Sequence, residues 1–323
     1  ISVTAVDFDT IYEEWIGLLP DSVTNNIFVT PWWQKTWWDA FGNDSELIIL
    51  AVRDSNRLLG IAPMQIKKGT LSFIGDTNLF DYHDFLVLRD SCDCFYQALF
   101  DSVMEFEWEV MCLTSLPDES PTLQQIPRLS KSNSLHVKVS EEDKAPLVNL
   151  PSSWEEYLAG LKKRNRHELR RKFRRLEKHN GIREYIYDTH DLVPEGMNDF
   201  FRLMRLSRSS KEEFLTVENK QFFSAIASEL TSLGFFKLHF LEVDNKRVAS
   251  CICFDYGGAY LLYNSGYDPN YSSLSVGLIN KASAVREAII RRKRRFEFLR
   301  GSERYKYDLG GEDRLLYEIT VRR

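Results

Sequence analysis

The stretch Tyr263–Leu278, YNSGYDPNYSSLSVGL, joins an aromatic-rich strand to the start of a helix. The four residues before it read AYLL and follow Gly257-Gly258, a pair typical of a tight turn between strands. Asp268-Pro269 is a turn-forming pair that opens a polar loop. We therefore predict a strand at 259–267, a loop at 268–276 and a helix at 277–292.

The segments on either side extend this pattern through the second half of the chain. Polar or glycine turns separate three apolar runs, which predicts an antiparallel meander. The expected order is a long helix, a strand, two helices, three strands, a helix and two strands. The ranges are 154–179, 182–187, 193–209, 220–233, 235–243, 247–256, 259–267, 277–292, 296–299 and 315–321.

The first half shows a shortened version of the same order. Thr30-Pro31 marks the start of a helix, because threonine caps helices and proline is favoured at the first helical position. Hairpin-like strands follow between residues 46 and 74. Residues 115–145 are polar and rich in Pro and Ser, which predicts an irregular linker. We therefore expect two domains, 1–146 and 147–323.

Composition narrows the class of protein. A chain of 323 residues with 43% hydrophobic residues can bury two cores, and a net charge of −5 argues against general nucleic-acid binding. Residues 162–178 and 286–306 are nonetheless strongly basic, which indicates a surface for an anionic ligand. The five cysteines lack zinc spacing, so we expect reduced thiols, no metal site and a cytoplasmic protein. No apolar run reaches the ~18 residues of a membrane helix.

Three motifs carry a resemblance to a known family. They are YNSGYDP at 263–269, SVGL at 275–278 and FEFLRGSERYK at 296–306. Together they resemble the CelD/BcsL-type acetyltransferases of the acyl-CoA N-acyltransferase (GNAT) superfamily, a branch associated with bacterial envelope polysaccharide. The basic helix after Trp154 and FVTPW at 28–32 resemble the same branch. The branch is similar in turn to the FemABX aminoacyl transferases, which use two GNAT units in tandem.

The resemblance implies a fold and an activity. The expected fold is mixed α+β, with two tandem GNAT-like domains, each a mostly antiparallel mixed sheet flanked by helices. The first domain would be degenerate, and the second would transfer an acyl group from acetyl-CoA or another acyl-CoA to an amine. One departure concerns the expected phosphate loop, in which 270–278 holds a single glycine, Gly277.

The resemblance and the chemistry together select candidate donor-site residues. The free N–H groups of a helix start bind phosphate, so Ser275, Val276, Gly277 and Leu278 are expected to hold the pyrophosphate of the donor. The alternative is that Ser275 only caps the helix and Gly277 only packs. Tyr263 and Tyr267 are expected on one face of their strand, where either could protonate the leaving thiolate or simply be buried.

The segment after the strand at 296–299 is polar, a good position for function. The FemABX resemblance makes Lys306 the leading candidate for assisting catalysis, and a solvated loop lysine is the alternative. We expect Arg300, Glu303 and Tyr305 to contact the substrate.

Two further groups are candidates for substrate binding. In the first half, Asp81, His83 and Asp84 could bind or deprotonate the amine acceptor, or belong to a polar loop without such a role. On the basic helix, Lys163, Arg166 and Arg170 match the family pattern and could contact phosphates, although most charges of such a helix are solvated.

Three functions follow from these observations. The first is an acyl-CoA-dependent N-acyltransferase acting on an amino sugar, amino acid or envelope precursor, free or linked to a nucleotide or lipid. The second is a FemABX-like peptidyltransferase that uses aminoacyl-tRNA. The third is an inactive GNAT scaffold that binds a nucleotide or protein, favoured by the poor glycine loop.

Overall fold

The computed structural model describes residues 1–323, which divide into two compact units. Residues 1–144 and 314–323 form the first unit, and residues 145–313 form the second. The elements of the first unit are β1 (Ser2–Val6), α1 (Phe8–Leu18), α2 (Pro31–Phe41), β2 (Glu46–Asp54), β3 (Arg57–Lys67), β4 (Thr70–Phe73), β5 (Leu86–Val87), α3 (Cys92–Val103), β6 (Val110–Pro117), α4 (Thr122–Ser132), β7 (His136–Lys144) and β14 (Leu315–Arg322).

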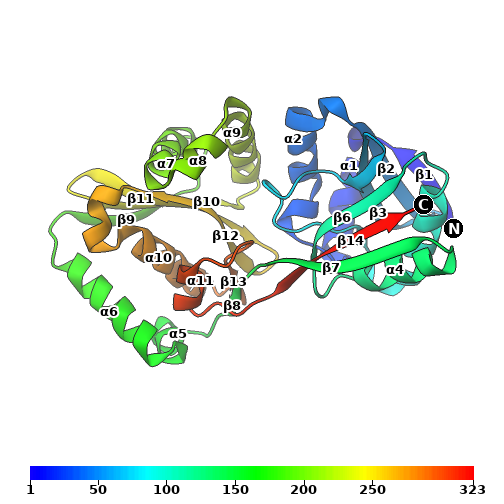
Figure 1. The fold of residues 1–323 in the computed structure, drawn as a ribbon. Coiled ribbons are helices and arrows are strands. Elements are labelled where there is room, and N and C mark those ends of the chain that lie inside the picture. Colours follow the sequence, from blue (N-terminus) through cyan, green and yellow to red (C-terminus); the bar gives the residue numbers. More distant parts are fainter. The chain divides into compact units, whose positions relative to one another are not determined.

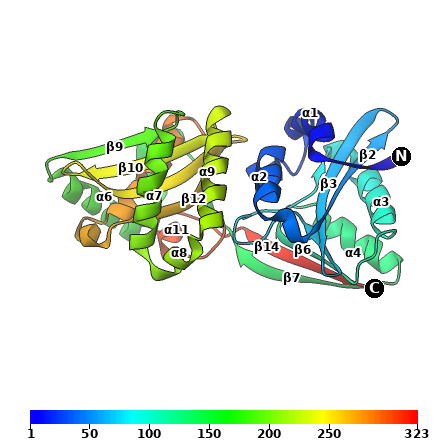
Figure 2. The same cartoon turned by 90° about the horizontal axis from the view of Figure 1, so that it is seen from above.

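The first unit is built on a mixed sheet in the order β1-β2-β3-β4-β6-β14-β7, with β5 paired to β3 (Figure 1). Its pairs are antiparallel except β4 with β6. Alternate residues of β2, Ile48, Leu50 and Val52, pack in one core cluster with residues of α3 and α4. Helices α1 and α2 lie on the other face of the sheet (Figure 2). Side-chain alternation along a strand therefore buries both faces.

The segment expected to be an irregular linker is ordered. Residues 122–132 form α4, whose buried residues include Ile126 and Leu129. Residues 136–144 form β7, the edge strand of the sheet, and most of its side chains are partly or fully exposed. The polar composition of this segment therefore reflects an exposed helix face and an edge strand, not an absence of structure.

The last strand belongs to the first unit and not, as expected, to the C-terminal domain. β14 lies between β6 and β7 and is antiparallel to both. Its buried residues Leu316, Ile319 and Val321 join the interior of that sheet. The pairing of β14 with β6 joins strands about 200 residues apart in the chain, which local sequence patterns do not encode.

The second unit holds the other sheet. Its elements are β8 (Leu147–Asn149), α5 (Trp154–Gly160), α6 (Lys163–Glu177), β9 (Ile182–Tyr187), α7 (Val193–Ser207), α8 (Ser209–Phe214), α9 (Val217–Ser232), β10 (Phe236–Val243), β11 (Lys246–Tyr256), β12 (Ala259–Tyr267), α10 (Val276–Ile290), β13 (Arg295–Glu297) and α11 (Arg304–Asp308). The strands are ordered β8-β13-β12-β11-β10-β9, and only β12 and β13 are parallel.

Helices cover both faces of this sheet. Figure 1 shows α7, α8 and α9 on one face and α5, α6, α10 and α11 on the other. The expected meander of three strands is confirmed as β10, β11 and β12, joined by two short turns. The fold class expected from the sequence, two units that each hold a mixed, mostly antiparallel sheet flanked by helices, is likewise confirmed.

The long basic helix is broken into two. α5 ends at Gly160, Leu161 adopts an extended backbone with ψ 146°, and α6 starts at Lys163. Leu161 is buried in the core cluster under α10, and the Arg166 guanidinium donates to the carbonyls of Ala159 and Leu161. Burying Leu161 and satisfying those carbonyls stabilises the break.

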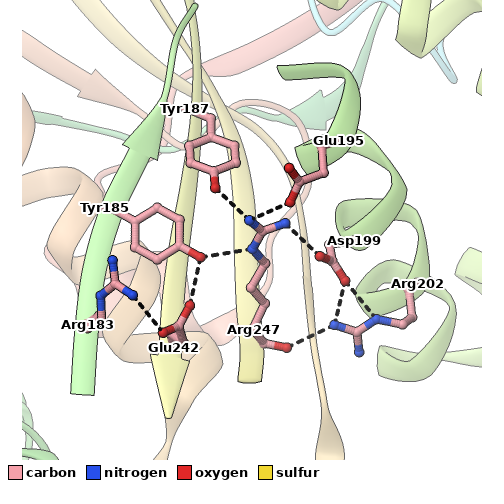
Figure 3. Close-up of polar contacts among 8 residues, drawn as sticks. All are labelled: Arg183, Tyr185, Tyr187, Glu195, Asp199, Arg202, Glu242 and Arg247. Carbon is pink, nitrogen blue, oxygen red and sulfur yellow. Dashed lines mark hydrogen bonds and ion pairs between the residues drawn. The ribbon is translucent and has the colours of Figure 1, made fainter. Parts of the chain in front are cut away.

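One polar cluster ties the β9 edge of this sheet to α7 (Figure 3). The Arg247 guanidinium donates to the hydroxyls of Tyr185 (2.9 Å) and Tyr187 (2.6 Å) and to Asp199 (2.7 Å), and pairs with Glu195 at 2.9 Å. The Arg247 side chain is only 12% exposed.

The charged side chains around Arg247 make the net charge of this cluster zero. Glu242 accepts from the Tyr185 hydroxyl at 3.0 Å and pairs with Arg183, and Arg202 pairs with Asp199 (Figure 3). Three arginines therefore meet three carboxylates. A cluster whose charges cancel needs no external ion, so we interpret it as structural.

Two sequence-predicted acceptor residues of the first unit are buried. Asp84 is 4% exposed, and one of its carboxylate oxygens accepts from Thr122 Oγ1 (2.5 Å) and from the Phe85 N–H (2.9 Å). Burial raises the pKa of Asp84 to about 7, although the hydrogen bond from Thr122 opposes the shift. His83 is 2% exposed and stacked on the rings of Phe73 and Phe80. Their burial favours structural roles.

Replacing Arg247 by Met should destabilise the second unit. Asp199 and two tyrosine hydroxyls lose a buried cationic partner, which costs about 2–4 kcal/mol. Differential scanning calorimetry measures the change. Arg183→Met is the matched control, because Arg183 is 66% exposed and should change stability by less than about 1 kcal/mol. Equal effects of the two substitutions would contradict a structural role specific to Arg247.

The raised pKa of Asp84 predicts a pH dependence of stability. The folded state holds the Asp84 proton more tightly than the unfolded chain, so the protein binds more protons when folded between about pH 4 and pH 7. The contribution of Asp84 to the free energy of unfolding has its full value below about pH 4. It falls by up to about 1.4 kcal/mol per pH unit as the pH rises to 7. Asp84→Asn should remove this slope, measured by urea denaturation. The exposed Asp101→Asn should leave it unchanged.

Candidate active site

The two parallel strands β12 and β13 pair over only three residues each, Ala259–Leu261 with Arg295–Glu297. β13 then ends, while β12 continues to Tyr267 with a strand partner on its β11 side alone. Along its other edge, residues 262–267 have no strand partner. Main-chain polar groups need hydrogen-bond partners when they are buried, so this edge is suited to a ligand or to side chains.

The pairing of β12 with β11 shifts register at Tyr263, which has no residue opposite it. The Tyr263 ring packs against Phe223 of α9 at 5.6 Å. The Tyr267 ring lies against Gly277 of α10, where an added Cβ would come within 3.0 Å of it. Because α9 and α10 cover opposite faces of the sheet, the prediction that both tyrosines share a face is wrong. The extra residue of the bulge reverses the alternation.

A pocket of about 450 Å³ lies at the free edge of β12. It gathers most of the residues that the sequence analysis selected in the second half. These are Tyr263, Tyr267, Ser275, Val276, Gly277, Leu278, Arg300, Glu303, Tyr305 and Lys306. The motifs at 263–269, 275–278 and 296–306 therefore form one site.

The start of α10 forms one wall of this pocket. Ser275 precedes the helix with a left-handed backbone (φ 58°), and its side chain makes no capping bond. Instead its hydroxyl accepts from Lys172 of α6 at 3.0 Å. The first N–H groups of a helix have no intrahelical acceptor, so those of Val276 and Gly277 are available to an anion.

The basic helix contributes to the site through other residues than expected. Lys172 lines the pocket, and Arg175 donates to the Ser273 carbonyl at 2.6 Å. Of the three predicted contacts, Arg166 bonds to backbone carbonyls at the helix break and Lys163 is exposed. Arg170 lines a separate hollow beside Trp154 and Phe173.

Lys306 organises the opposite wall. Its side chain is 2% exposed, and its ammonium donates to the carbonyls of Leu299 (2.9 Å), Arg300 (2.5 Å) and Gly301 (2.9 Å) and pairs with Glu303 at 3.0 Å. It is therefore not a solvated loop lysine. Burial alone would raise the pKa of Glu303, but the neighbouring Lys306 ammonium lowers it.

Two lysines in the pocket, one buried and one half-buried, were missed by the sequence analysis. Lys281, 8% exposed, donates to the Gly277 carbonyl at 3.1 Å and lies over the Tyr305 ring at 4.7 Å. Lys211 donates to Asn264 Oδ1 at 3.0 Å and to the Ser265 carbonyl. Burial, followed by the nearby charges of Lys281 and Arg208, lowers the pKa of Lys211 to about 7.

A sequence signal existed for only one of these lysines. Lys281 follows Gly277 by one helical turn, so the helix prediction already places it near the donor loop. Lys211 lies on the short helix α8, 53 residues before Asn264 and 54 before Ser265 of β12, and no local pattern connects the two elements.

The three residues that the sequence analysis selected in the first unit differ in exposure. Asp84 and His83 are buried as described above, and Asp81 is half-buried.

No group of three or more His, Cys, Asp or Glu side chains is placed to hold a metal ion. None of the helices has both the length and the apolar character needed to cross a membrane.

Comparison with known proteins supports this picture of the second unit. The family described as "Acetyltransferase (GNAT) domain" matches residues 163–307, which include every residue lining the pocket. No curated protein matches the sequence.

Solved structures show the fold of the whole chain. The crystal structure of FemX is similar over 98% of this chain and 97% of its own, with a TM-score of 0.69 and 11% identity. The C-terminal domain of a putative lysylphosphatidylglycerol synthetase from Agrobacterium fabrum gives a TM-score of 0.62 at 9% identity, covering 98% and 92%. A tandem GNAT protein from the clavulanic acid biosynthesis pathway gives 0.50 at 11%, covering 98% and 97%.

These likenesses extend over both units, whereas the family match lies within the second. The pocket sits inside the matched region, at the edge where β12 loses its partner. Residues 163–307 thus match the acetyltransferase (GNAT) domain family, which supports an acyltransferase, and the whole chain shares the fold of FemX and of a tandem GNAT protein.

Proposed function

We propose that the pocket binds an acyl-CoA such as acetyl-CoA and that the enzyme transfers the acyl group to an amine. The observation that carries the proposal is the meeting of two features in one pocket. One is the free edge of β12 beyond Leu261, and the other is the free N-terminus of α10. A thioester donor with a pyrophosphate and an amide-bearing arm requires both.

Each feature matches one part of such a donor. The N–H groups of Val276 and Gly277, with the positive end of the α10 dipole, suit the pyrophosphate. The edge of β12 beyond Leu261, where side chains and no strand contact the backbone of Ser265, suits an extended arm with amide groups, which would pair with β12 as a neighbouring strand does. Lys172, held on Ser275, adds positive charge at the same helix start.

The charge of the pocket also favours an anionic ligand. Lys172, Arg208, Lys211, Lys281 and Arg300 line it, while its one carboxylate, Glu303, pairs with Lys306. Buried cations normally have anionic partners. The cationic excess is therefore the expected property of a site for a phosphorylated donor.

The reaction proposed is direct attack by the amine on the thioester. The amine nitrogen bonds to the carbonyl carbon, the carbon–sulfur bond breaks, and the sulfur leaves as a thiolate that takes up a proton. The Tyr263 and Tyr305 side chains line the pocket where the proton transfers and the acyl group would lie. The Tyr267 ring, packed on Gly277, positions the helix start instead.

The acceptor proposed is a small amine of envelope metabolism, such as an amino sugar, an amino acid or an envelope precursor. The resemblance of the 263–306 motifs to the CelD/BcsL branch supports this class. Asp81 of the first unit, which is half-buried, stays a prediction as an amine-binding residue, whereas the buried Asp84 and His83 support its segment.

A second function has its own support. The fold similarity to FemX covers nearly the whole chain, and α6 carries exposed basic residues, including Arg170, Arg171 and Arg174. These features favour a donor that is an aminoacyl-tRNA, whose phosphates would contact α6. In that case α6 substitutions weaken binding and acyl-CoA has no effect.

Thermal unfolding separates these functions. A ligand at a hundredfold excess over its Kd stabilises the native state by about 2.7 kcal/mol, which raises Tm by several degrees. We expect this shift with acetyl-CoA and not with aminoacyl-tRNA. A shift with the tRNA alone would support the second function, and no shift with either ligand would leave an inactive scaffold.

Gly277→Leu should abolish the acetyl-CoA shift while the protein stays folded. A side chain there displaces the Tyr267 ring, since even a Cβ comes within 3.0 Å of it. Gly17→Leu in α1 is the matched control, because an added Cβ at Gly17 meets nothing within 4 Å. Normal acetyl-CoA binding by the Gly277 variant would show that the phosphates bind elsewhere.

We propose that Lys306 supports catalysis by holding the 299–303 wall, and Lys306→Met tests this. Three carbonyls and Glu303 lose a buried cation, so stability should fall by about 2–4 kcal/mol and acetyl-CoA binding should weaken with it. Arg304→Met is the control, since Arg304 is 80% exposed on the same helix. A variant of unchanged stability that loses only kcat would instead make Lys306 a catalytic residue.

A further inference from the structure

Lys211 is placed where a proton must be removed during acyl transfer. It is held on α8, and its ammonium reaches the free edge of β12, where it contacts Asn264 Oδ1 and the Ser265 carbonyl. These two residues follow the register shift at Tyr263 directly. Lys211 therefore lies one hydrogen bond from the stretch of backbone proposed to hold the donor arm.

The contacts of Lys211 leave room for a lone pair. A neutral lysine amine has two N–H donors and one lone pair arranged tetrahedrally, whereas the charged form has three donors. The two acceptors on β12 account for two donors. A neutral Lys211 can keep both hydrogen bonds and direct its lone pair into the pocket.

The charges that face Lys211 favour its neutral form. Arg208 precedes α8, Lys281 comes from α10, and Glu303 comes from the loop before α11. Lys172, Arg300 and Lys306 line the same pocket, with Tyr263 and Tyr305. Glu303 pairs with Lys306, so the surroundings remain strongly cationic. Burial and this repulsion lower the pKa of Lys211 to about 7, so half of it is neutral near neutral pH.

The other titratable groups of the wall are less suited to accept a proton. The Glu303 carboxylate is held by the Lys306 ammonium, which lowers its pKa and its basicity. Lys306 itself donates to three carbonyls. Lys281 is covered by the Tyr305 ring and donates to the Gly277 carbonyl.

We propose that Lys211 is the proton acceptor for the attacking amine, a role that rests on the proposed acyl transfer in this pocket. As the amine nitrogen bonds to the thioester carbon, one N–H proton moves to the Lys211 nitrogen and the carbon–sulfur bond breaks. The leaving thiolate then takes a proton from the Lys211 ammonium, which restores the neutral amine. The products are the amide and the free thiol, and no oxidant or metal is consumed.

The first experiment measures Lys211 directly and requires no acceptor. The full chain is labelled with acetic anhydride between about pH 6 and pH 10, and mass spectrometry follows each lysine. Lys211 should reach half of its maximal reactivity near pH 7, and saturating acetyl-CoA should slow its labelling at least about fivefold. Exposed Lys178 provides the internal reference. Titration of Lys211 together with Lys178 would overturn the proposal.

The second experiment separates a proton acceptor from a positive charge. Lys211→Arg keeps a charged donor for Asn264 and Ser265 but cannot give up a proton near neutral pH. Thiol release from acetyl-CoA is measured with a panel of amines. We expect kcat to fall about 100-fold or more, KM for acetyl-CoA to stay within about threefold, and the pH dependence near 7 to disappear. Lys178→Arg should match the wild type.

The outcomes distinguish this proposal from the proposed function. An arginine variant with normal kcat would show that Lys211 acts as a fixed cation that holds an anionic group, which overturns the proposal. If acetyl-CoA neither shifts Tm nor slows the labelling of Lys211, the result contradicts the proposed acyl-CoA function itself. If acetyl-CoA has both effects but no amine in the panel is a substrate, the pH dependence of Lys211 labelling alone tests the proposal.

Discussion

The structure of the second unit depends on the short pairing between β12 and β13. A parallel pair that ends after three residues leaves the rest of β12 without a neighbour in the sheet. The interior of a sheet tolerates such an edge only where other groups occupy it. Here Lys211 and the Asn264 side chain bond to the backbone of Ser265, the loop at 299–303 provides a wall, and α10 starts beside it. The pocket exists because the sheet opens.

Two polar clusters in the same unit differ in charge balance. Around Arg247, three arginines meet three carboxylates, and the hydroxyls of Tyr185 and Tyr187 also accept from Arg247 (Figure 3). In the pocket, several buried or half-buried cations surround a single carboxylate that Lys306 already pairs with. A balanced cluster stabilises the fold by itself, whereas an unbalanced one weakens it until an anion binds or a lysine loses its proton. This difference supports the proposal that the pocket binds a ligand, whereas the Arg247 cluster is structural.

The sequence predicted the element order well because that order depends on local patterns. The turns around Tyr263–Leu278, the helix start at Gly277 and the polar segment through Lys306 all form parts of one pocket, as their motifs indicated. What failed depends on long-range pairing. The last strand inserts into the first sheet, and the polar edge strand β7 resembled a linker. One extra residue at Tyr263 places Tyr263 and Tyr267 on opposite faces of the second sheet. None of these follows from periodicity alone.

Lys211 and Lys306 show why residue type alone does not assign a role. Both are lysines whose amines contact backbone carbonyls of the pocket. Lys306 has three carbonyl acceptors and a carboxylate, which stabilise its charge and make it a cross-link of its loop. Lys211 has two acceptors, no carboxylate within hydrogen-bonding distance and cationic neighbours, so its charged form is the costly one. The number and charge of the acceptors, which only the folded chain provides, therefore make one lysine a fixed cation and the other a base.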